Sequence, residues 1–259
     1  MSGTFNMTNL NASAKSRGVV LFANNTSTVD YELIAEQAAR LIKHTLGLPV
    51  TILSSTESNN NYRTGYAHGT QWNNLNRYHA YELSPYDETL LLDSDYLILD
   101  DSLLKVLDTV DDYTIMTHNQ NPIGSTNSDM GMTSLQQVWA TAIVFKRTSK
   151  TQMLFDLVGR IQRNYEYYRK LYNIREYNFR NDYAFSIADN IINGYTQSTG
   201  IPWTMLTIDN VIKTIGINDD QLIIREQETA QVIPRQNIHV MDKDYLQSDS
   251  HIRFVDLIC

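Results

Sequence analysis

The sequence contains one cysteine, Cys259, which is its last residue. A single cysteine excludes an internal disulfide and a structural zinc site built from several cysteines. The chain also lacks an apolar run close to the roughly 20 residues that cross a bilayer. Its beginning, MSGTFNMTNLNASAKSRG, lacks the compact apolar stretch of a secretion signal. We therefore expect a cytoplasmic protein with no membrane partner.

Several common catalytic motifs are absent as well. The chain has no P-loop, no dinucleotide-binding fingerprint and no Ser-His-Asp arrangement at a known spacing. No repeat with a period of about 20 to 50 residues is present. The net charge of −8 argues against a surface adapted all over to nucleic acid.

The residues that are present suit a folded α/β protein. Apolar residues make up 42% of the 259 positions and aromatic residues 10%, which suffices for a core and argues against wholesale disorder. Short apolar runs alternate with amphipathic segments, and this alternation predicts a mainly parallel, twisted sheet flanked by helices. The strands are expected at 18–25, 49–55, 112–118 and 137–147, and residues 89–98 are expected to form a strand that enters a polar turn. We expect one domain over residues 17–259, preceded by a flexible tail over residues 1–16.

The helices are expected between these strands. Asp30 suits the N-cap of the first helix, and Gly47 suits its end. Further helices are expected at 100–110 and 182–193. One long amphipathic helix should follow the last strand. Its buried stripe should consist of Met153, Leu154, Leu157, Val158, Ile161, Tyr165, Tyr168 and Tyr172.

Two polar stretches, 56–76 and 117–137, are long for connections inside a compact domain. Loops of this kind more often carry binding residues than serve as plain linkers. We expect both stretches to face a substrate.

An acidic pair, Asp93 and Asp95, follows the apolar run Thr-Leu-Leu-Leu. Side chains two residues apart in an extended chain point to the same side, so both carboxylates can face one point beyond the strand. Neighbouring carboxylates repel unless one is protonated or a cation lies between them, and Mg²⁺ or Mn²⁺ prefers such oxygen ligands. Acidic turns also produce this pattern by chance. The position after a buried strand favours a metal site.

A histidine and a lysine lie four residues apart near the end of the chain. The neutral imidazole of His239 would serve as a third metal ligand, and Lys243 would neutralise a departing diphosphate. The alternative is a histidine that only hydrogen-bonds to the backbone. His118, at the end of an expected strand, is a spare candidate.

Asp182 lies in the polar segment REYNFRNDYAFSIAD, beside several aromatic residues. It would accept a hydrogen bond from a sugar or an acceptor hydroxyl, or it would cap the helix that begins there. The region from Lys146 to Arg180 carries nine basic and three acidic residues. This region either attracts phosphate or forms a solvated helix face.

Four segments together resemble glycosyltransferases of the GT-A fold, above all glycogenin-related enzymes and glycosyltransferase-like proteins of tailed phages. The segments are SPYDETLLLDSDYLI (84–98), WATAIVFK (139–146), FRNDYAFSIA (179–188) and IHVMDK (238–243). They follow the family's order over about residues 17–246. The resemblance implies a single-domain GT-A fold, that of the nucleotide-diphospho-sugar transferases. It also implies sugar transfer from a nucleotide-diphosphate donor, with a UDP-sugar favoured, to a hydroxyl group.

The resemblance also implies roles for individual residues. Asp93, Asp95 and His239 would bind Mn²⁺ or Mg²⁺, and Asp182 matches the position that handles the sugar or the acceptor. Contacts to the donor would come from Phe22, Ala23, Asn24, Asn25, Thr56, Arg77, Asp93 and Lys243. The chain lacks the Gly and the Lys-Pro-Trp run that follow this histidine in glycogenin-type enzymes. The resemblance therefore does not identify the residues that contact the diphosphate.

The phage relatives imply an acceptor, the hydroxymethyl group of a modified pyrimidine in phage DNA, and a location in the host cytoplasm. The expected phosphate contacts are Arg160, Arg163, Arg169, Lys170, Arg175 and Arg180. Asp182 as a base would give inversion, whereas Asp182 as a positioning residue leaves retention open. The sequence does not determine the oligomeric state.

Two alternatives to a glycosyltransferase remain. A sugar nucleotidyltransferase would carry a Gly-rich phosphate loop after the first strand, where this chain has FANNTST. The other alternative is a non-catalytic sugar- or DNA-binding protein on the same fold.

Overall fold

A computed structural model of the chain describes residues 15–54, 76–117, 137–196, 198–226 and 229–259. It also describes the backbone of two short paired strands, β3 (Asn61–Tyr62) and β4 (Gln71–Trp72). Thr56, His118 and nearly all of the expected substrate-facing stretches lie outside the described residues, as do residues 1–14 of the expected tail. None of the helices in the described ranges combines the length and apolar character of a bilayer-spanning segment.

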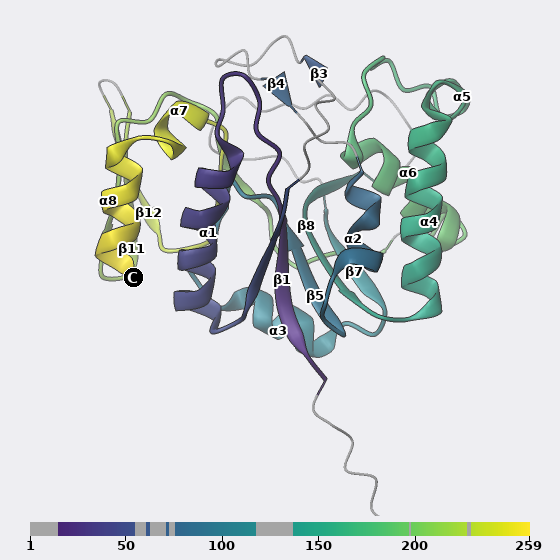
Figure 1. The fold of residues 1–259 in the computed structure, drawn as a ribbon, viewed down its shortest axis with the longest axis horizontal. Helices are drawn as coiled ribbons and strands as arrows, with labels where there is room; N and C mark the ends of the chain where they lie inside the picture. Colours follow the sequence, from purple (N-terminus) through teal and green to yellow (C-terminus); the bar gives the residue numbers. More distant parts are fainter. Residues whose placement is uncertain are drawn as a thin grey trace, which may run out of the picture.

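A five-stranded sheet with the order β2-β1-β5-β8-β7 forms the centre of the molecule (Figure 1). Its strands are β1 (Arg17–Phe22), β2 (Val50–Leu53), β5 (Glu88–Leu92), β7 (Tyr113–Thr117) and β8 (Val138–Lys146). β1 pairs in parallel with β2 and with β5, and β8 is antiparallel to both of its neighbours. All strands except β8 therefore run in one direction, which confirms the predicted mainly parallel sheet.

Helices cover both faces of this sheet (Figure 1). One face packs against α1 (Tyr31–Leu46) and α3 (Ser102–Thr109). The other face packs against α2 (Ala80–Leu83), α4 (Ser149–Arg163) and α6 (Asn181–Ile192). Successive residues of β5 alternate between the two layers: Leu90 and Leu92 face α1, and Leu91 faces α4 and α6. Burial on both faces explains why this strand is a continuous apolar run.

The first helix begins and ends where the sequence predicts. The Asp30 side chain accepts a hydrogen bond from the Leu33 backbone N–H at 3.0 Å, which satisfies one of the unpaired donors of the first turn. Gly47 follows the last turn with a φ of 66°, a left-handed conformation that glycine adopts without steric cost. Both predicted caps are confirmed.

The predicted long helix is wrong, because it consists of two helices. α4 ends at Arg163, and α5 (Tyr165–Leu171) begins after Asn164. The Asn164 side chain donates a hydrogen bond to the Arg160 carbonyl at 2.9 Å, and such local bonds compete with helix continuation. Met153 is 59% exposed and does not belong to the buried stripe.

The C-terminal part contains a layer that the sequence did not reveal. β10 (Thr214–Asn218), β11 (Gln221–Arg225) and β12 (Ala230–Pro234) form an antiparallel sheet. After it come α7 (Lys243–Leu246) and α8 (Asp249–Ile258). α8 packs beside α1 and against β10 (Figure 1).

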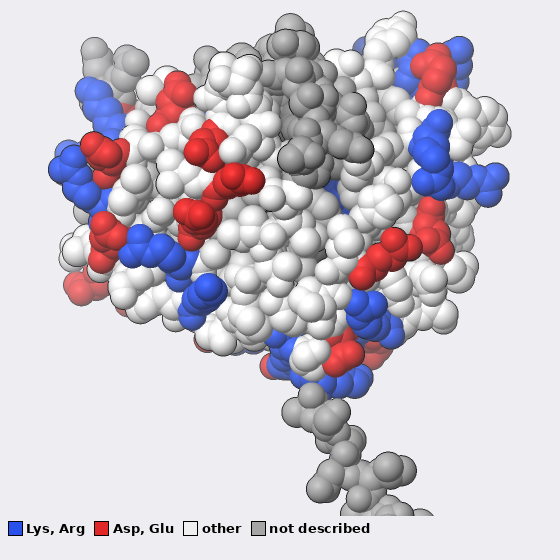
Figure 2. Space-filling view, viewed as in Figure 1, with Lys and Arg blue, Asp and Glu red and all other residues white. Residues whose placement is uncertain are grey.

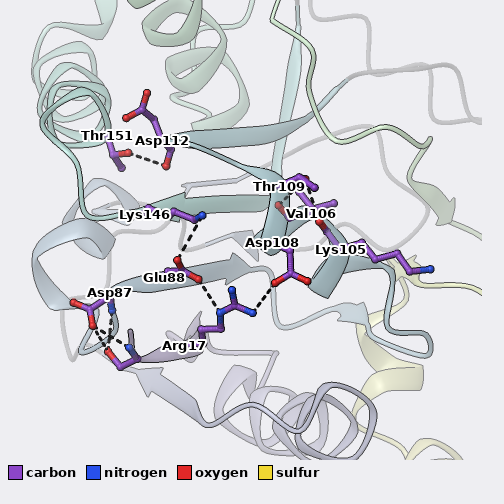
Figure 3. A network of polar contacts seen from close by, with 11 residues as sticks. Arg17, Asp87, Glu88, Lys105, Val106, Asp108, Thr109, Asp112, Lys146 and Thr151 are labelled. Carbon is purple, nitrogen blue, oxygen red and sulfur yellow. Dashed lines mark hydrogen bonds and ion pairs between the residues drawn. The ribbon is translucent and has the colours of Figure 1, made fainter. Parts of the chain in front are cut away.

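A polar network closes the edge of the sheet where β1 and β5 begin (Figure 3). Arg17 donates to Glu88 and to Asp108, each at 2.7 Å. The Lys146 ammonium lies 3.5 Å from the other oxygen of Glu88. Both oxygens of this buried carboxylate therefore face a cation, which offsets the cost of burying its charge.

Candidate functional site

Two short strands bring distant parts of the chain together at the opposite edge of the sheet. Asp93 and Asp95 lie in the turn between β5 and β6 (Tyr96–Leu97). β6 pairs with β13 (Ile238–Val240), which places His239 opposite Tyr96. Asp93, Asp95 and His239 each offer a ligand atom within 4.8 Å of the others. The structure therefore brings the three predicted metal ligands together.

Asp95 is buried between a lysine and the histidine. Its Oδ2 accepts a hydrogen bond from Lys243 Nζ at 2.5 Å, and its Oδ1 lies 3.4 Å from His239 Nε2. Burial alone would raise the pKa of Asp95, but the charge of Lys243 and the contact with His239 outweigh it and lower the pKa. Asp95 is consequently an anion in the folded protein.

Asp93 accepts a hydrogen bond from the Arg77 guanidinium, and its backbone N–H donates to the Thr141 carbonyl at 2.9 Å. Burial raises the pKa of Asp93, and the nearby charge of Asp95 raises it further, whereas Arg77 lowers it. The Asp93 side chain is 24% exposed, so it is the more accessible carboxylate of the pair.

The atoms around this triad fit a divalent cation. His239 Nε2 and Asp95 Oδ1 are buried and have no hydrogen-bond partner among the described residues. The Thr207 hydroxyl lies 3.4 Å from the other ring nitrogen, Nδ1, which orients the imidazole. Buried polar atoms without partners are rare in folded proteins and call for a ligand or an ion. Two carboxylates and an imidazole suit Mg²⁺ or Mn²⁺.

Arg77 begins the short 3₁₀ turn η1 (Arg77–His79) and is 3% exposed. One of its nitrogens bonds to Asp93, whereas Nε and Nη2 have no hydrogen-bond partner in the described part of the chain. A buried guanidinium with two unpaired nitrogens can bind an anion. This geometry suits the donor contact that the resemblance implies for Arg77.

Other residues that are expected to contact the donor lie along the end of β1. Leu21 pairs with Leu92, so Phe22, Ala23 and Asn24 lie at the same edge of the sheet as Asp93. Phe22 is half-buried, whereas Ala23 and Asn24 are buried. The Ala23 backbone N–H donates to the Leu53 carbonyl at 2.9 Å.

Three residues near the triad were not predicted. Thr141 and Thr207 contact Asp93 and His239 respectively. Tyr31, the first residue of α1, lies near the acidic pair: burial first, then the charges of Asp95 and Asp93, raise the pKa of its phenol. The signal for Tyr31 is its position at the start of the helix after β1, because that helix begins at the carboxyl edge of the sheet.

Asp182 does not cap α6. The helix begins at Asn181, and its N-cap position makes no side-chain hydrogen bond. Asp182 Oδ1 instead accepts the Ala140 backbone N–H at 2.9 Å, and Oδ2 accepts a bond from Arg180 at 2.6 Å. The predicted capping role is therefore wrong. The pairing register of β7 and β8 shifts at this point. The Ala140 N–H therefore bonds to the Asp182 side chain and not to a neighbouring strand.

The hydrogen bond between Asp182 and Ala140 connects α6 to the strand that lies beside Asp93. Ala140 precedes Thr141, whose carbonyl binds the Asp93 backbone. Ser186, one turn after Asp182, accepts the Val138 backbone N–H at 2.9 Å. Asp182 therefore positions the β8 segment that supports Asp93, and a direct contact with sugar or acceptor stays a prediction.

The arginines expected to contact phosphate fall into two groups. Arg169 and Arg180 are buried and pair with Glu166 and Asp182, at 2.5 and 2.6 Å. Those expected contacts that are exposed are Arg160, Arg163, Lys170 and Arg175. Figure 2 shows basic side chains on the side of the molecule formed by α4 and α5, at the right of the view. Lys170 also pairs with Glu166, at 2.9 Å. Arg160, Arg163 and Arg175 make no ion pair with a described residue, so they can bind phosphate without first losing a carboxylate partner.

No protein-family model matches the chain, and no curated protein matches its sequence. Among solved structures, the glycosyltransferase GlyE of Streptococcus pneumoniae TIGR4 is similar at 12% identity and a TM-score of 0.41, over 69% of this chain and 43% of that one. An active-site mutant of LgtC is similar at 14% identity and a TM-score of 0.42, over 66% of this chain and 69% of that one. The galactosyltransferase LgtC in complex with donor and acceptor sugar analogs is similar at 14% identity and a TM-score of 0.40, again over 66% of this chain and 69% of that one. The matched region spans less than half of the GlyE chain.

Proposed function

We propose that the chain is a metal-dependent glycosyltransferase, which transfers a sugar from a nucleotide-diphosphate donor to a hydroxyl group. The observation that carries this proposal is the convergence of Asp93, Asp95 and His239 beside two buried cations, Arg77 and Lys243. The triad offers ligands for a divalent cation, and the two cations suit phosphate oxygens. The carboxyl edge of parallel strands is also the usual nucleotide site of α/β sheets.

Each group has a distinct part in the proposed reaction. A bound divalent cation would supply charge stabilisation for the departing diphosphate. Arg77 binds phosphate oxygens through Nε and Nη2, which no described residue occupies. Asp182 holds β8, and through it Asp93, in place. If Asp182 also removes the acceptor proton, the reaction inverts the sugar configuration, and otherwise a retaining path is open.

On the resemblance of the sequence segments, the donor is a UDP-sugar, the ion is Mn²⁺ or Mg²⁺, and the acceptor is a hydroxymethylated pyrimidine of phage DNA in the host cytoplasm. Tyr167 and Tyr177 are 65% and 76% exposed, and the exposed basic residues Lys170 and Arg175 lie within three positions of them in the chain. Exposed aromatic rings stack on unpaired bases, and cations contact the phosphates. We assign residues 17–259 to one catalytic domain, preceded by the tail.

A thermal-shift and activity screen with UDP- and GDP-sugars, with Mn²⁺ or with EDTA, tests the proposal. A donor that binds the native state should raise the melting temperature only when Mn²⁺ is present. Asp93→Asn and His239→Ala should abolish this shift. Asp156→Asn, an exposed acid on α4, is the matched control and should keep it. The proposal fails if no nucleotide-sugar binds under any of these conditions.

The same assays separate the two alternatives. A non-catalytic binding protein would bind the donor but neither hydrolyse nor transfer it over long incubation. A sugar nucleotidyltransferase would form pyrophosphate from a sugar phosphate and a nucleoside triphosphate. Donor hydrolysis that depends on Mn²⁺, without pyrophosphate formation, supports the glycosyltransferase.

A further inference from the structure

The two acids of the site each have their own buried cation. Arg77 pairs with Asp93, and Lys243 pairs with Asp95. The side chains of Arg77 and Lys243 are 4% and 2% exposed. Because water screens these buried charges little, the two positive groups act strongly on any ion that approaches the pair. Apart from the imidazole, the four charged groups sum to zero.

Lys243 shares its carboxylate with the candidate metal position. It holds Oδ2 of Asp95, while Oδ1 of the same group faces His239. Lys243 Nζ also donates to the Val240 carbonyl at 3.0 Å, and the Val240 backbone N–H donates to the Asp95 carbonyl at 2.9 Å. The lysine is therefore anchored to β13, the strand that carries His239. A divalent cation bound by the triad would lie next to an anchored positive charge.

We propose that Arg77 and Lys243 are built-in counter-ions that keep the acidic pair from binding a divalent cation until the phosphates of a donor arrive. This inference rests on the proposed function and adds a coupling between its two ligands. Without donor, a dication meets a site whose carboxylates are already neutralised. A diphosphate at Arg77 and Lys243 supplies new negative charge, so the metal and the nucleotide raise each other's affinity by the same factor.

A purely structural role for the two cations makes the opposite prediction. Buried carboxylates need partners for stability alone, and removal of one partner leaves an uncompensated charge. In that case loss of Lys243 lowers stability but does not increase the affinity for a divalent ion in the absence of nucleotide. The metal affinity of the free protein therefore distinguishes the two roles.

Mn²⁺ titrations of the full chain, followed by calorimetry and by the electron paramagnetic resonance of free Mn²⁺, test the coupling. They are run without nucleotide, with UDP and with GDP. The wild type should bind Mn²⁺ at least about tenfold more tightly with one of the nucleotides. Lys243→Met should bind Mn²⁺ alone about tenfold more tightly than the wild type, because one repelling charge is gone. In Lys243→Met, the nucleotide should therefore increase the affinity for Mn²⁺ by a smaller factor than in the wild type.

Two further variants control the measurement. Lys146→Met removes another largely buried lysine that faces a carboxylate, Glu88, at the opposite edge of the sheet, and should leave Mn²⁺ binding unchanged. Lys243→Arg keeps the positive charge and should not bind Mn²⁺ alone more tightly than the wild type. Circular dichroism and melting in EDTA report whether each variant is folded.

The outcomes distinguish this inference from the proposed function. If no variant binds Mn²⁺ with or without nucleotide, the metal site itself fails, and the inference with it. If the wild type binds Mn²⁺ equally well with and without nucleotide, only the coupling is refuted. The same holds if Lys243→Met folds but binds Mn²⁺ alone no more tightly than the wild type. If Lys243→Met does not fold, an equal affinity of the wild type for Mn²⁺ with and without nucleotide still refutes the coupling.

Discussion

Acidification should destabilise the fold through one buried histidine, His251 of α8. The ring is fully buried and packs against Tyr245 and Phe254, with ring centroids 5.3 and 6.1 Å away. Neither ring nitrogen has a hydrogen-bond partner among the described residues. Burial therefore lowers the pKa of His251 from 6.5 to about 4, because the charged imidazolium would lose its hydration.

The sign and size of the effect follow from this difference. Between about pH 6.5 and pH 4 the unfolded chain binds a proton at His251 that the folded chain does not bind, so the free energy of unfolding falls as the pH falls. At 1.36 kcal/mol for each unit of pKa difference, the full loss is about 3 kcal/mol, reached below about pH 4. Between pH 7 and pH 5 the loss is about 2 kcal/mol.

Urea unfolding of the wild type and of His251→Phe at several pH values measures this loss. The difference in unfolding free energy between the two proteins should shift by about 2 kcal/mol in favour of the variant from pH 7 to pH 5. Other titrating groups are common to both proteins and cancel. His44→Phe, at an exposed position on α1, is the matched control and should show no such shift. A constant difference for His251→Phe would refute the reasoning.

Three further predictions concern stability and binding. Asp182→Ala should lower the free energy of unfolding by about 1–3 kcal/mol in urea melts, because the buried Ala140 N–H loses its acceptor. Gly159→Ala should cost a similar amount, about 1–3 kcal/mol, since its Cβ would lie 2.7 Å from the Tyr78 ring. The double variant Tyr167→Ala/Tyr177→Ala should weaken the binding of a fluorescent single-stranded oligonucleotide, measured by anisotropy, while the protein stays folded despite the lost contact between Tyr177 and Arg169. Unchanged anisotropy would contradict nucleic-acid binding at this surface.

The central sheet could be predicted because its strands carry their own signal. β1 and β5 are buried on both faces and are therefore continuous apolar runs. The antiparallel sheet of β10, β11 and β12 was missed for the opposite reason. Its strands have five residues each and contain few buried positions, two in β11, one in β10 and none in β12, which is too little for a clear period. Asp219 and Asp220 form the two-residue turn between β10 and β11, and Asp219 has a φ of 50°. This pair of turn-forming residues is the sequence feature that indicates a hairpin.

The site was predictable in its residues but not in its connections. The acidic pair follows a strong strand, so its position is a local property of the sequence. The proximity of His239 depends on β6 and β13, strands of two and three residues that have no pattern of their own. The partners of Lys243 and Asp182 are also set by tertiary contacts. His239, Lys243 and Asp182 each had two physically reasonable roles in the sequence, and their contacts depend on the fold.

The two edges of the central sheet show why the site lies at one of them. At the edge where the strands begin, both oxygens of Glu88 face a cation, Arg17 or Lys146 (Figure 3). At the carboxyl edge, Asp95 also has a buried lysine, and its Oδ1 faces His239 Nε2 at 3.4 Å without a hydrogen bond among the described residues. His239 Nε2 and two nitrogens of Arg77 share that condition. Buried charge is therefore common to both edges, and the polar atoms without hydrogen bonds at the carboxyl edge are the reason why we propose the ligand site there.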